Sequence, residues 1–156
     1  MCLRFGVPSI GRFNVSESAN RVVPSEPSNY WVYETDSAEE VVFVASGLCV
    51  DSCIGAARML RDMGIGASVL NIVVQGEYPG RLLNRLDKKT VVVVYNGNPD
   101  TIRFPLSAGL LDSGVRPNSI HSFGFDEGST GSLEDLVQHY GLDKKSLAMK
   151  VAEIKR

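Results

Sequence analysis

Five consecutive β-branched residues run from Thr90 to Val94, and the run continues into Tyr95. Such residues have restricted side-chain torsions and favour strands over helices. A second apolar run, from Val41 to Ala45, has the same character. Neither run alternates with polar residues, which is typical of strands that are buried on both faces of a parallel sheet. The sequence must therefore supply helices for both faces of such a sheet.

Helical periodicity follows the first of these strands. After Gly47, apolar residues recur at steps of three and four, which places them on one helix face: Val50, Cys53, Ile54, Ala57 and Leu60. Gly64 then supplies a stop signal. Shorter strands are predicted at 31–33, 67–73 and 119–123, and further helices at 78–86, 106–111, 133–140 and 147–154. Ser132 and Asp135 resemble a capping box at the start of the 133–140 helix.

This alternation of strands and helices predicts an α/β fold with three layers, α/β/α, around a mostly parallel sheet of about five strands. A chain of 156 residues suits one domain with a single core. Residues 1–28 are rich in Pro, Gly, Ser and Asn and have no sustained period, which is typical of a linker or arm. The sequence therefore divides into an arm at 1–28 and a folded domain at 29–156.

Charge and composition exclude several classes of protein. A formal net charge of −2 gives no general attraction to nucleic acid or to an anionic membrane. No apolar run approaches the ~20 residues that cross a bilayer, so we expect no membrane association. The three cysteines, Cys2, Cys49 and Cys53, are an odd number without the spacing of a disulfide framework. They indicate a reducing compartment, and hence a cytoplasmic protein.

Candidate catalytic residues are scarce. Cys49 and Cys53 are four residues apart on a predicted helix, where we expect them to act as small core residues rather than metal ligands. His121 and His139 are the only histidines, and no spacing unites them with the cysteines. No set of nucleophile, base and orienting residue can be assembled. We therefore predict no catalytic, cofactor-binding or metal-binding residues in this chain.

Two small-residue loops lie before predicted helices, where free backbone amides can bind an anion. The loop at 47–52 contains Asp51, which would repel an anion, and has neither the dinucleotide nor the phosphate-loop fingerprint. The better candidate anion site is formed by Ser129, Thr130, Gly131 and Ser132. For both loops, a purely structural role at the start of a helix is the favoured interpretation.

Several strings of residues resemble one family. They are EVVFVASG at 40–47, AARMLRDMGI at 56–65, and GFDEGSTGS, LEDL and YGLD in the final stretch at 124–143. In this order they resemble the C-terminal domain of transketolase. Upstream, LRFGVPS at 3–9 looks like the exit from the preceding pyrimidine-binding domain. The sequence departs from the family at 74–80 and at 95–99, so the family's usual contacts there are not carried over.

The resemblance implies a part of an enzyme rather than a whole one. In this family, thiamine diphosphate and Mg²⁺ are held by a "G-D-G … N" motif of the N-terminal domain, and the activating glutamate comes from the middle domain. This sequence contains neither, so we expect no cofactor in this chain and no activity by the chain alone. The resemblance further implies the N-terminal and middle domains as partners, in the same or a separate chain, and a homo-oligomer that this domain supports as a dimer.

Two alternatives stay open from the sequence. One is a free-standing regulatory or ligand-binding domain that senses a phosphorylated metabolite through the loop at 129–132. The other is the equivalent domain of deoxyxylulose phosphate synthase or of a 2-oxoacid dehydrogenase beta subunit. The substrate of the parent enzyme does not follow from this domain, because the family's sugar-phosphate contacts lie mainly in the others.

Overall fold

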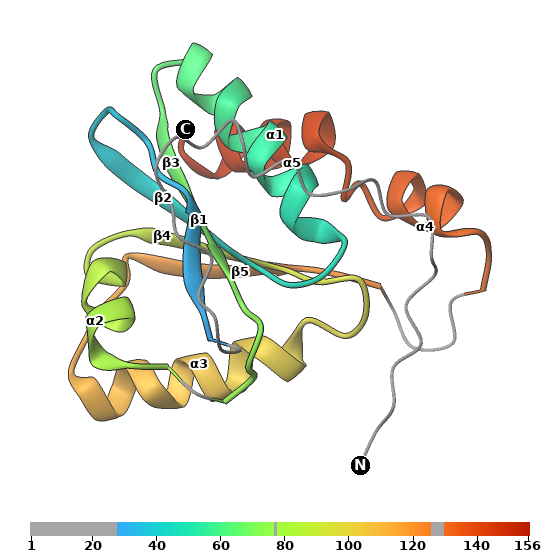
Figure 1. The fold of residues 1–156 in the computed structure, drawn as a ribbon. Coiled ribbons are helices and arrows are strands. Elements are labelled where there is room, and N and C mark those ends of the chain that lie inside the picture. The colour runs from blue at the N-terminus through green and yellow to red at the C-terminus, as the bar shows by residue number, and fades with distance from the viewer. Residues whose placement is uncertain (1–27, 77, 126–129) are drawn as a thin grey trace.

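The computed structural model describes residues 28–76, 78–125 and 130–156. Their strands form one five-stranded sheet in the order β1-β3-β2-β4-β5 (Figure 1). The strands are β1 (Tyr30–Tyr33), β2 (Glu39–Ala45), β3 (Gly66–Asn71), β4 (Thr90–Val94) and β5 (Ser119–Phe123). Strands β2 to β5 pair in parallel, while β1 pairs with β3 antiparallel. This confirms the mostly parallel sheet predicted from the sequence.

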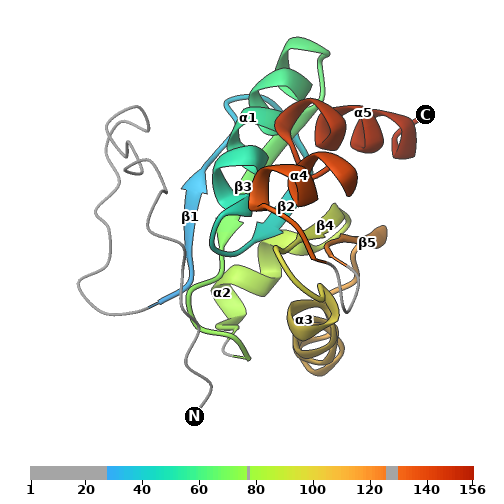
Figure 2. The ribbon, with the colours of Figure 1, turned by 90° about the vertical axis from the view of Figure 1, so that its right-hand side faces the viewer.

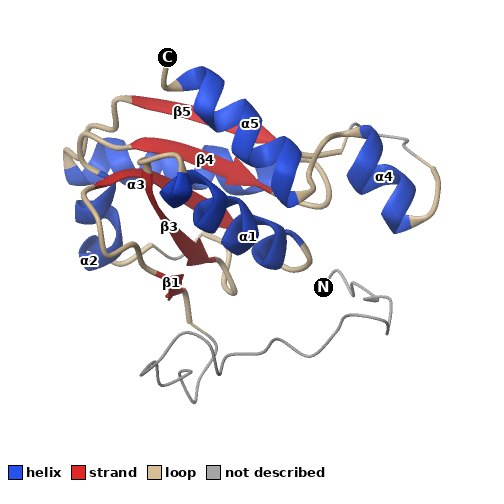
Figure 3. Cartoon of the chain, turned by 90° about the horizontal axis from the view of Figure 1, so that it is seen from above, coloured by secondary structure: helices blue, strands red, loops and turns tan. Residues whose placement is uncertain are grey.

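Helices cover both faces of the sheet. On one side lie α1 (Cys49–Asp62) and α5 (Lys144–Ile154), with α4 (Leu133–His139) beside them. On the other side lie α2 (Gly80–Leu83), the 3-10 turn η2 (Asn84–Leu86) and α3 (Asp100–Ser113). Figure 2 shows the two helical layers separated by the sheet, and Figure 3 shows β1 and β5 at its opposite edges. The three-layer α/β/α fold is confirmed.

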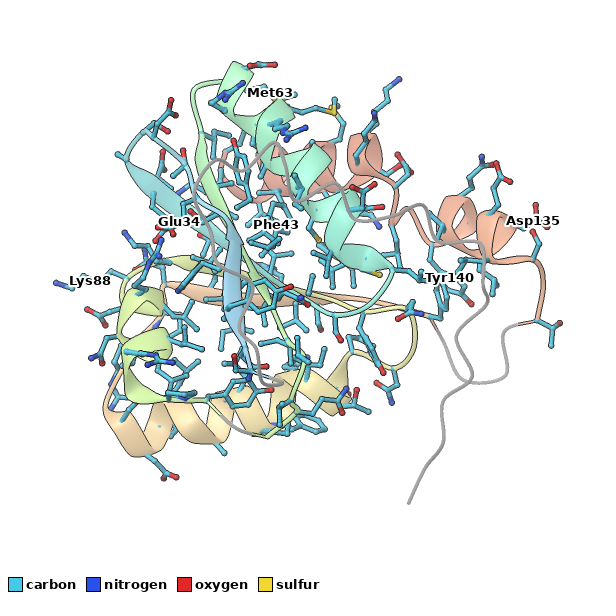
Figure 4. The ribbon with its side chains drawn as sticks, in the orientation of Figure 1. Glu34, Phe43, Met63, Lys88, Asp135 and Tyr140 are labelled. Atoms are coloured by element: carbon cyan, nitrogen blue, oxygen red, sulfur yellow. The ribbon has the colours of Figure 1, made fainter. Side chains whose placement is uncertain are left out.

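The continuous apolar strands lack alternating polar residues because both of their faces are buried under helices. Along β2, Val41 and Phe43 face the core half beneath α1 and α5, while Val42 and Val44 face the half beneath α2 and α3. All four side chains are fully buried. Phe43 lies at the centre of the molecule (Figure 4). A polar residue on either face would lose its water without gaining a partner, so the strand cannot alternate.

Several elements differ in extent from the predictions: the helix predicted at 78–86 is α2 followed by η2, and the helix predicted at 147–154 begins at Lys144. The strand predicted at 67–73 ends at Asn71. The Ile72 amide still donates to the Ala45 carbonyl, and beyond it the Oδ1 of Asn29 accepts from the amides of Val73 and Val74. The helix predicted at 106–111 begins earlier, at Asp100, with Pro105 inside it. Its first turn is fixed by Asn98, whose Oδ1 accepts from the Asp100 amide.

A charged cluster ties three elements together at the amino edge of the parallel strands. Arg85 donates to Glu34 at 2.9 Å and to Glu39 at 2.7 Å. Its guanidinium carbon lies 3.7 Å from the centre of the Trp31 ring. Because planar guanidinium groups bind carboxylates and stack on aromatic faces at the same time, one arginine joins η2 to β1 and β2.

The predicted arm at 1–28 lies outside the described residues, apart from Ser28. Among the helices that the structure does describe, none has the length and apolar character needed to cross a membrane.

Candidate functional site

The carboxyl ends of the parallel strands meet at one edge of the sheet. In open α/β folds, ligands usually bind at this edge. In this structure the loops at that edge pack closely on one another. The Phe125 amide donates to the Gly97 carbonyl at 3.0 Å. A side chain at Gly124 would collide with that same carbonyl and with the Pro99 ring. These contacts join the turn after β4 to the exit of β5.

The loop at 47–52 forms the start of α1. Gly47 has a φ of +61°, which favours glycine, and its carbonyl accepts from the Val50 amide at 3.3 Å. Cys49 and Cys53 are both buried and free. Burial raises the pKa of Cys49 to about 12 and the pKa of Cys53 well above its ordinary value. Neither thiol can supply a thiolate near neutral pH, so both act as core residues.

The candidate anion loop is described from Thr130 onward, and Ser129 lies outside the described residues. Thr130, Gly131 and Ser132 are exposed. The Ser132 hydroxyl accepts from the Asp135 amide at 3.2 Å and donates to the Asp135 carboxylate at 2.6 Å. Ser132 is therefore the N-cap of α4, as predicted, but the Asp135 carboxylate accepts from the Ser132 hydroxyl, whereas a full capping box needs it to accept from the Ser132 backbone amide. These bonds engage the hydroxyl of Ser132 and place a carboxylate at the loop, and both features oppose the binding of an anion there.

An aromatic cluster lies next to this loop. The rings of Phe125 and Tyr140 have centroids 5.4 Å apart, and His139 meets Tyr140 edge-on at 4.9 Å. Figure 4 shows Tyr140 on the side of α4 nearest the sheet and Asp135 on its outer side. These contacts pack α4 against the end of β5.

Lys150 fixes the end of α4, a role that the sequence analysis missed. Its ammonium group donates to the carbonyls of Tyr140 and Gly141 at 2.8 and 3.0 Å. It also lies 4.7 Å from the centre of the Phe123 ring. Burial lowers the pKa of Lys150 from its ordinary value. The sequence feature that could have predicted this role is the position of Lys150, three residues after Leu147 and beside the apolar stripe of the last helix.

The two histidines stay apart. His121 lies on β5 with its Nε2 3.1 Å from the Ser119 hydroxyl, while His139 lies on α4. Within residues 28–76, 78–125 and 130–156, no three His, Cys, Asp or Glu side chains are grouped so that they could hold a metal ion.

The sequence matches no family model and none of the curated proteins. Solved structures do match. A split-gene transketolase, described as an inactive beta4 tetramer, has a TM-score of 0.68 at 22% identity. Transketolases from Campylobacter jejuni and Leishmania mexicana have TM-scores of 0.59 and 0.58, each at 18% identity. The chain has the fold of a transketolase C-terminal-type domain.

The structural match covers most of this chain but only part of each transketolase chain. The match covers 84% of this chain and 43% of the split-gene transketolase chain. For the other two transketolases it covers 81% of this chain and 18% of theirs. The family resemblance predicted from the strings at 40–65 and 124–143 is therefore confirmed at the level of the fold.

Proposed function

We propose that this chain serves as the C-terminal, non-catalytic domain of a transketolase-like thiamine diphosphate enzyme in the cytoplasm. In this role it packs against the N-terminal and middle domains, in the same or a separate chain, and supports the dimer. The observation that carries the proposal is the unequal coverage: the match takes in 84% of this chain but 43% of the split-gene transketolase chain. A domain of that extent supplies one part of such an enzyme.

Two further observations support a structural role. The carboxyl edge of the sheet is occupied by its own loops, through the contact of Phe125 with Gly97. Both described thiols are buried, with raised pKa values. The split-gene transketolase offers a precedent for distribution over separate chains, since its beta4 tetramer is described as inactive. Thiamine diphosphate supplies the carbanion chemistry in such an enzyme, and the residues that would bind it belong to the other domains.

Isothermal titration of the chain with thiamine diphosphate and Mg²⁺ tests the proposal. We expect no saturable heat, because the sequence lacks the "G-D-G … N" motif of the family. Micromolar binding of the cofactor by this chain alone would contradict the proposal.

A second titration, with inorganic phosphate followed by amide NMR shifts, tests the ligand-binding alternative. Because Ser132 is engaged with Asp135, we expect no saturable shift at millimolar phosphate. Saturable shifts confined to residues 128–133 would instead support a phosphate-sensing domain.

A further inference from the structure

The turn between β4 and α3 contains the pair Asn96-Gly97 (Figure 1). Among all the asparagines of the sequence, Asn96 alone is followed by glycine. Both residues are half-buried, and they lie outside the neighbouring strand and helix. The hydrogen bonds of a regular element therefore do not fix the backbone torsions of this pair.

Two hydrogen bonds hold the turn on either side of Asn96. The Tyr95 amide donates to the Phe123 carbonyl at 3.1 Å, and the Phe125 amide donates to the Gly97 carbonyl at 3.0 Å. Between these bonds lies the peptide group that joins Asn96 to Gly97. Within the described part of the chain, nothing hydrogen-bonds the carbonyl or the amide of that peptide group, or the side-chain amide of Asn96.

Two glycines leave space around the Asn96 side chain. Its Oδ1 lies 3.5 Å from the point at which a side chain on Gly47 would begin. Gly97, the next residue along the chain, carries no side chain to shield its own amide nitrogen. The side-chain carbonyl carbon of Asn96 and the Gly97 nitrogen can therefore approach each other.

We propose that Asn96 is a site of spontaneous deamidation in the folded chain. The Gly97 amide nitrogen loses its proton and attacks the side-chain carbonyl carbon of Asn96. A new C–N bond forms, the bond to the side-chain nitrogen breaks, and that nitrogen leaves as ammonia with the proton. The product is a cyclic succinimide, which water opens at either carbonyl to give isoaspartate or aspartate. The reaction consumes only water and needs no oxidant or reductant.

Other asparagines of the described residues lack this combination of features. Asn98 precedes Pro99, whose nitrogen carries no hydrogen to lose. Asn118 precedes a serine, and its side-chain nitrogen donates to the Lys88 carbonyl at 2.7 Å. We therefore expect Asn96 to react first.

Isoaspartate at position 96 loosens the contact between this turn and the exit of β5. Its main chain runs through the former side chain, which adds a methylene group between Tyr95 and Gly97. The bonds from Tyr95 to Phe123 and from Phe125 to Gly97 then no longer fit the same spacing. This inference goes beyond the proposed function, because it concerns the ageing of the chain itself.

Peptide mapping of the full chain tests the site, after ageing at body temperature and mildly alkaline pH in heavy-oxygen water. Trypsin releases residues 90–103, since Lys89 and Arg103 end the adjoining peptides. Heavy oxygen marks the deamidation that occurs during ageing and distinguishes it from deamidation during the digest. We expect the 90–103 peptide to gain isoaspartate before a peptide with any other described asparagine does.

Ageing the same chain in urea tests whether the folded state itself reacts. Because the reacting peptide group is free in the folded chain, we expect the folded rate to lie within about tenfold of the rate in urea. A reaction confined to the small unfolded fraction would be at least about a thousandfold slower than in urea, and that result would overturn the proposal.

Three variants identify the reacting groups. Gly97→Ala places a methyl group beside the attacking nitrogen, and we expect the rate to fall at least about tenfold in buffer and in urea alike. Asn96→Gln would require a larger ring, so we expect no product at this position. Asn84→Gln is the matched control, since Asn84 is exposed on η2 and its replacement should leave the rate at Asn96 unchanged. The measurements in urea keep the comparison valid even for a variant that folds poorly.

Hydrogen exchange tests the effect on the turn. The new carboxylate allows anion exchange to separate the modified fraction. In that fraction we expect the Phe125 amide to exchange faster, while the Ile72 amide, bonded to the Ala45 carbonyl at 2.7 Å, stays protected. Unchanged protection of Phe125 would overturn the proposed loosening. A folded chain without isoaspartate at position 96, an earlier reaction at another described asparagine, or a Gly97→Ala variant that reacts like the wild type would overturn the proposed site. The proposed function would survive each of these outcomes.

Discussion

At the scale of single residues, Arg85 holds together segments that are far apart in the sequence. Its guanidinium group binds the carboxylates of Glu34 and Glu39 and stacks on Trp31. Side-chain exposures of 33%, 33% and 15% for Arg85, Glu34 and Glu39 leave solvent to screen part of the attraction. We expect Arg85→Ala to lower the free energy of unfolding by about 1–2 kcal/mol, as measured by urea denaturation.

Two further variants separate geometry from charge in this cluster. Arg85→Lys keeps the positive charge but loses the planar fork and the stacking. We therefore expect Arg85→Lys to lower the free energy of unfolding by most of the amount that Arg85→Ala does. Arg81→Ala removes an exposed arginine from α2 and should change the stability by less than about 0.5 kcal/mol. An Arg85→Lys variant as stable as the wild type would show that charge alone holds the cluster.

At the scale of elements, the start of α5 depends on the carboxylate of Asp143. Its Oδ1 accepts from the amides of Lys145 and Ser146, both at 3.0 Å. Hydrogen bonds from Ser146 are the main cause that lowers the pKa of Asp143 below its ordinary value of 3.8. We expect Asp143→Ala to cost about 1 kcal/mol of unfolding free energy at pH 7, the usual cost of removing a helix cap.

The charge of Asp143 adds a pH dependence with a defined sign. Because its pKa is lower in the folded state, the charged form contributes stability above pH 3.8, and this contribution is lost as the pH falls through the folded pKa. Asp143→Asn keeps an acceptor oxygen without the charge. The urea midpoint of the wild type should exceed that of Asp143→Asn by a constant amount from about pH 5 to 8, and the gap should narrow progressively as the pH falls below about 4. A gap of the same size at pH 3 as at pH 6 would contradict this account.

At the scale of the whole molecule, the two core halves lie on opposite faces of one sheet and should unfold together. Trp31, the only tryptophan, packs in the half beneath α2 and α3, so its fluorescence reports that half. Leu147 is fully buried in the other half, on α5. We expect Leu147→Ala to cost about 2–5 kcal/mol and to shift the Trp31 transition as far as the circular dichroism transition. Separate shifts of the two probes would show that the halves unfold independently.

Local patterns in the sequence determined the elements of this fold. Strands β2 and β4 followed from β-branched runs without polar interruption, and the N-cap bond from the Asp135 amide to the Ser132 hydroxyl followed from a spacing of three residues. Residues 119–123 matched β5 at both ends. Each of these features depends on neighbours within one turn or one strand, so its energetics can be inferred from adjacent residues.

Only the tertiary structure decided which contacts join distant parts of the chain. The antiparallel pairing of β1 with β3 did not follow from the sequence, because pairing direction depends on how the connections close in space. The role of Lys150 depends on carbonyls nine and ten residues away, brought near by the turn between α4 and α5. The buried face of α3 did not follow from the sequence for the same reason. A helix that is apolar on two sides has no single preferred buried face, so packing on the sheet chose Leu106 and left Leu111 exposed.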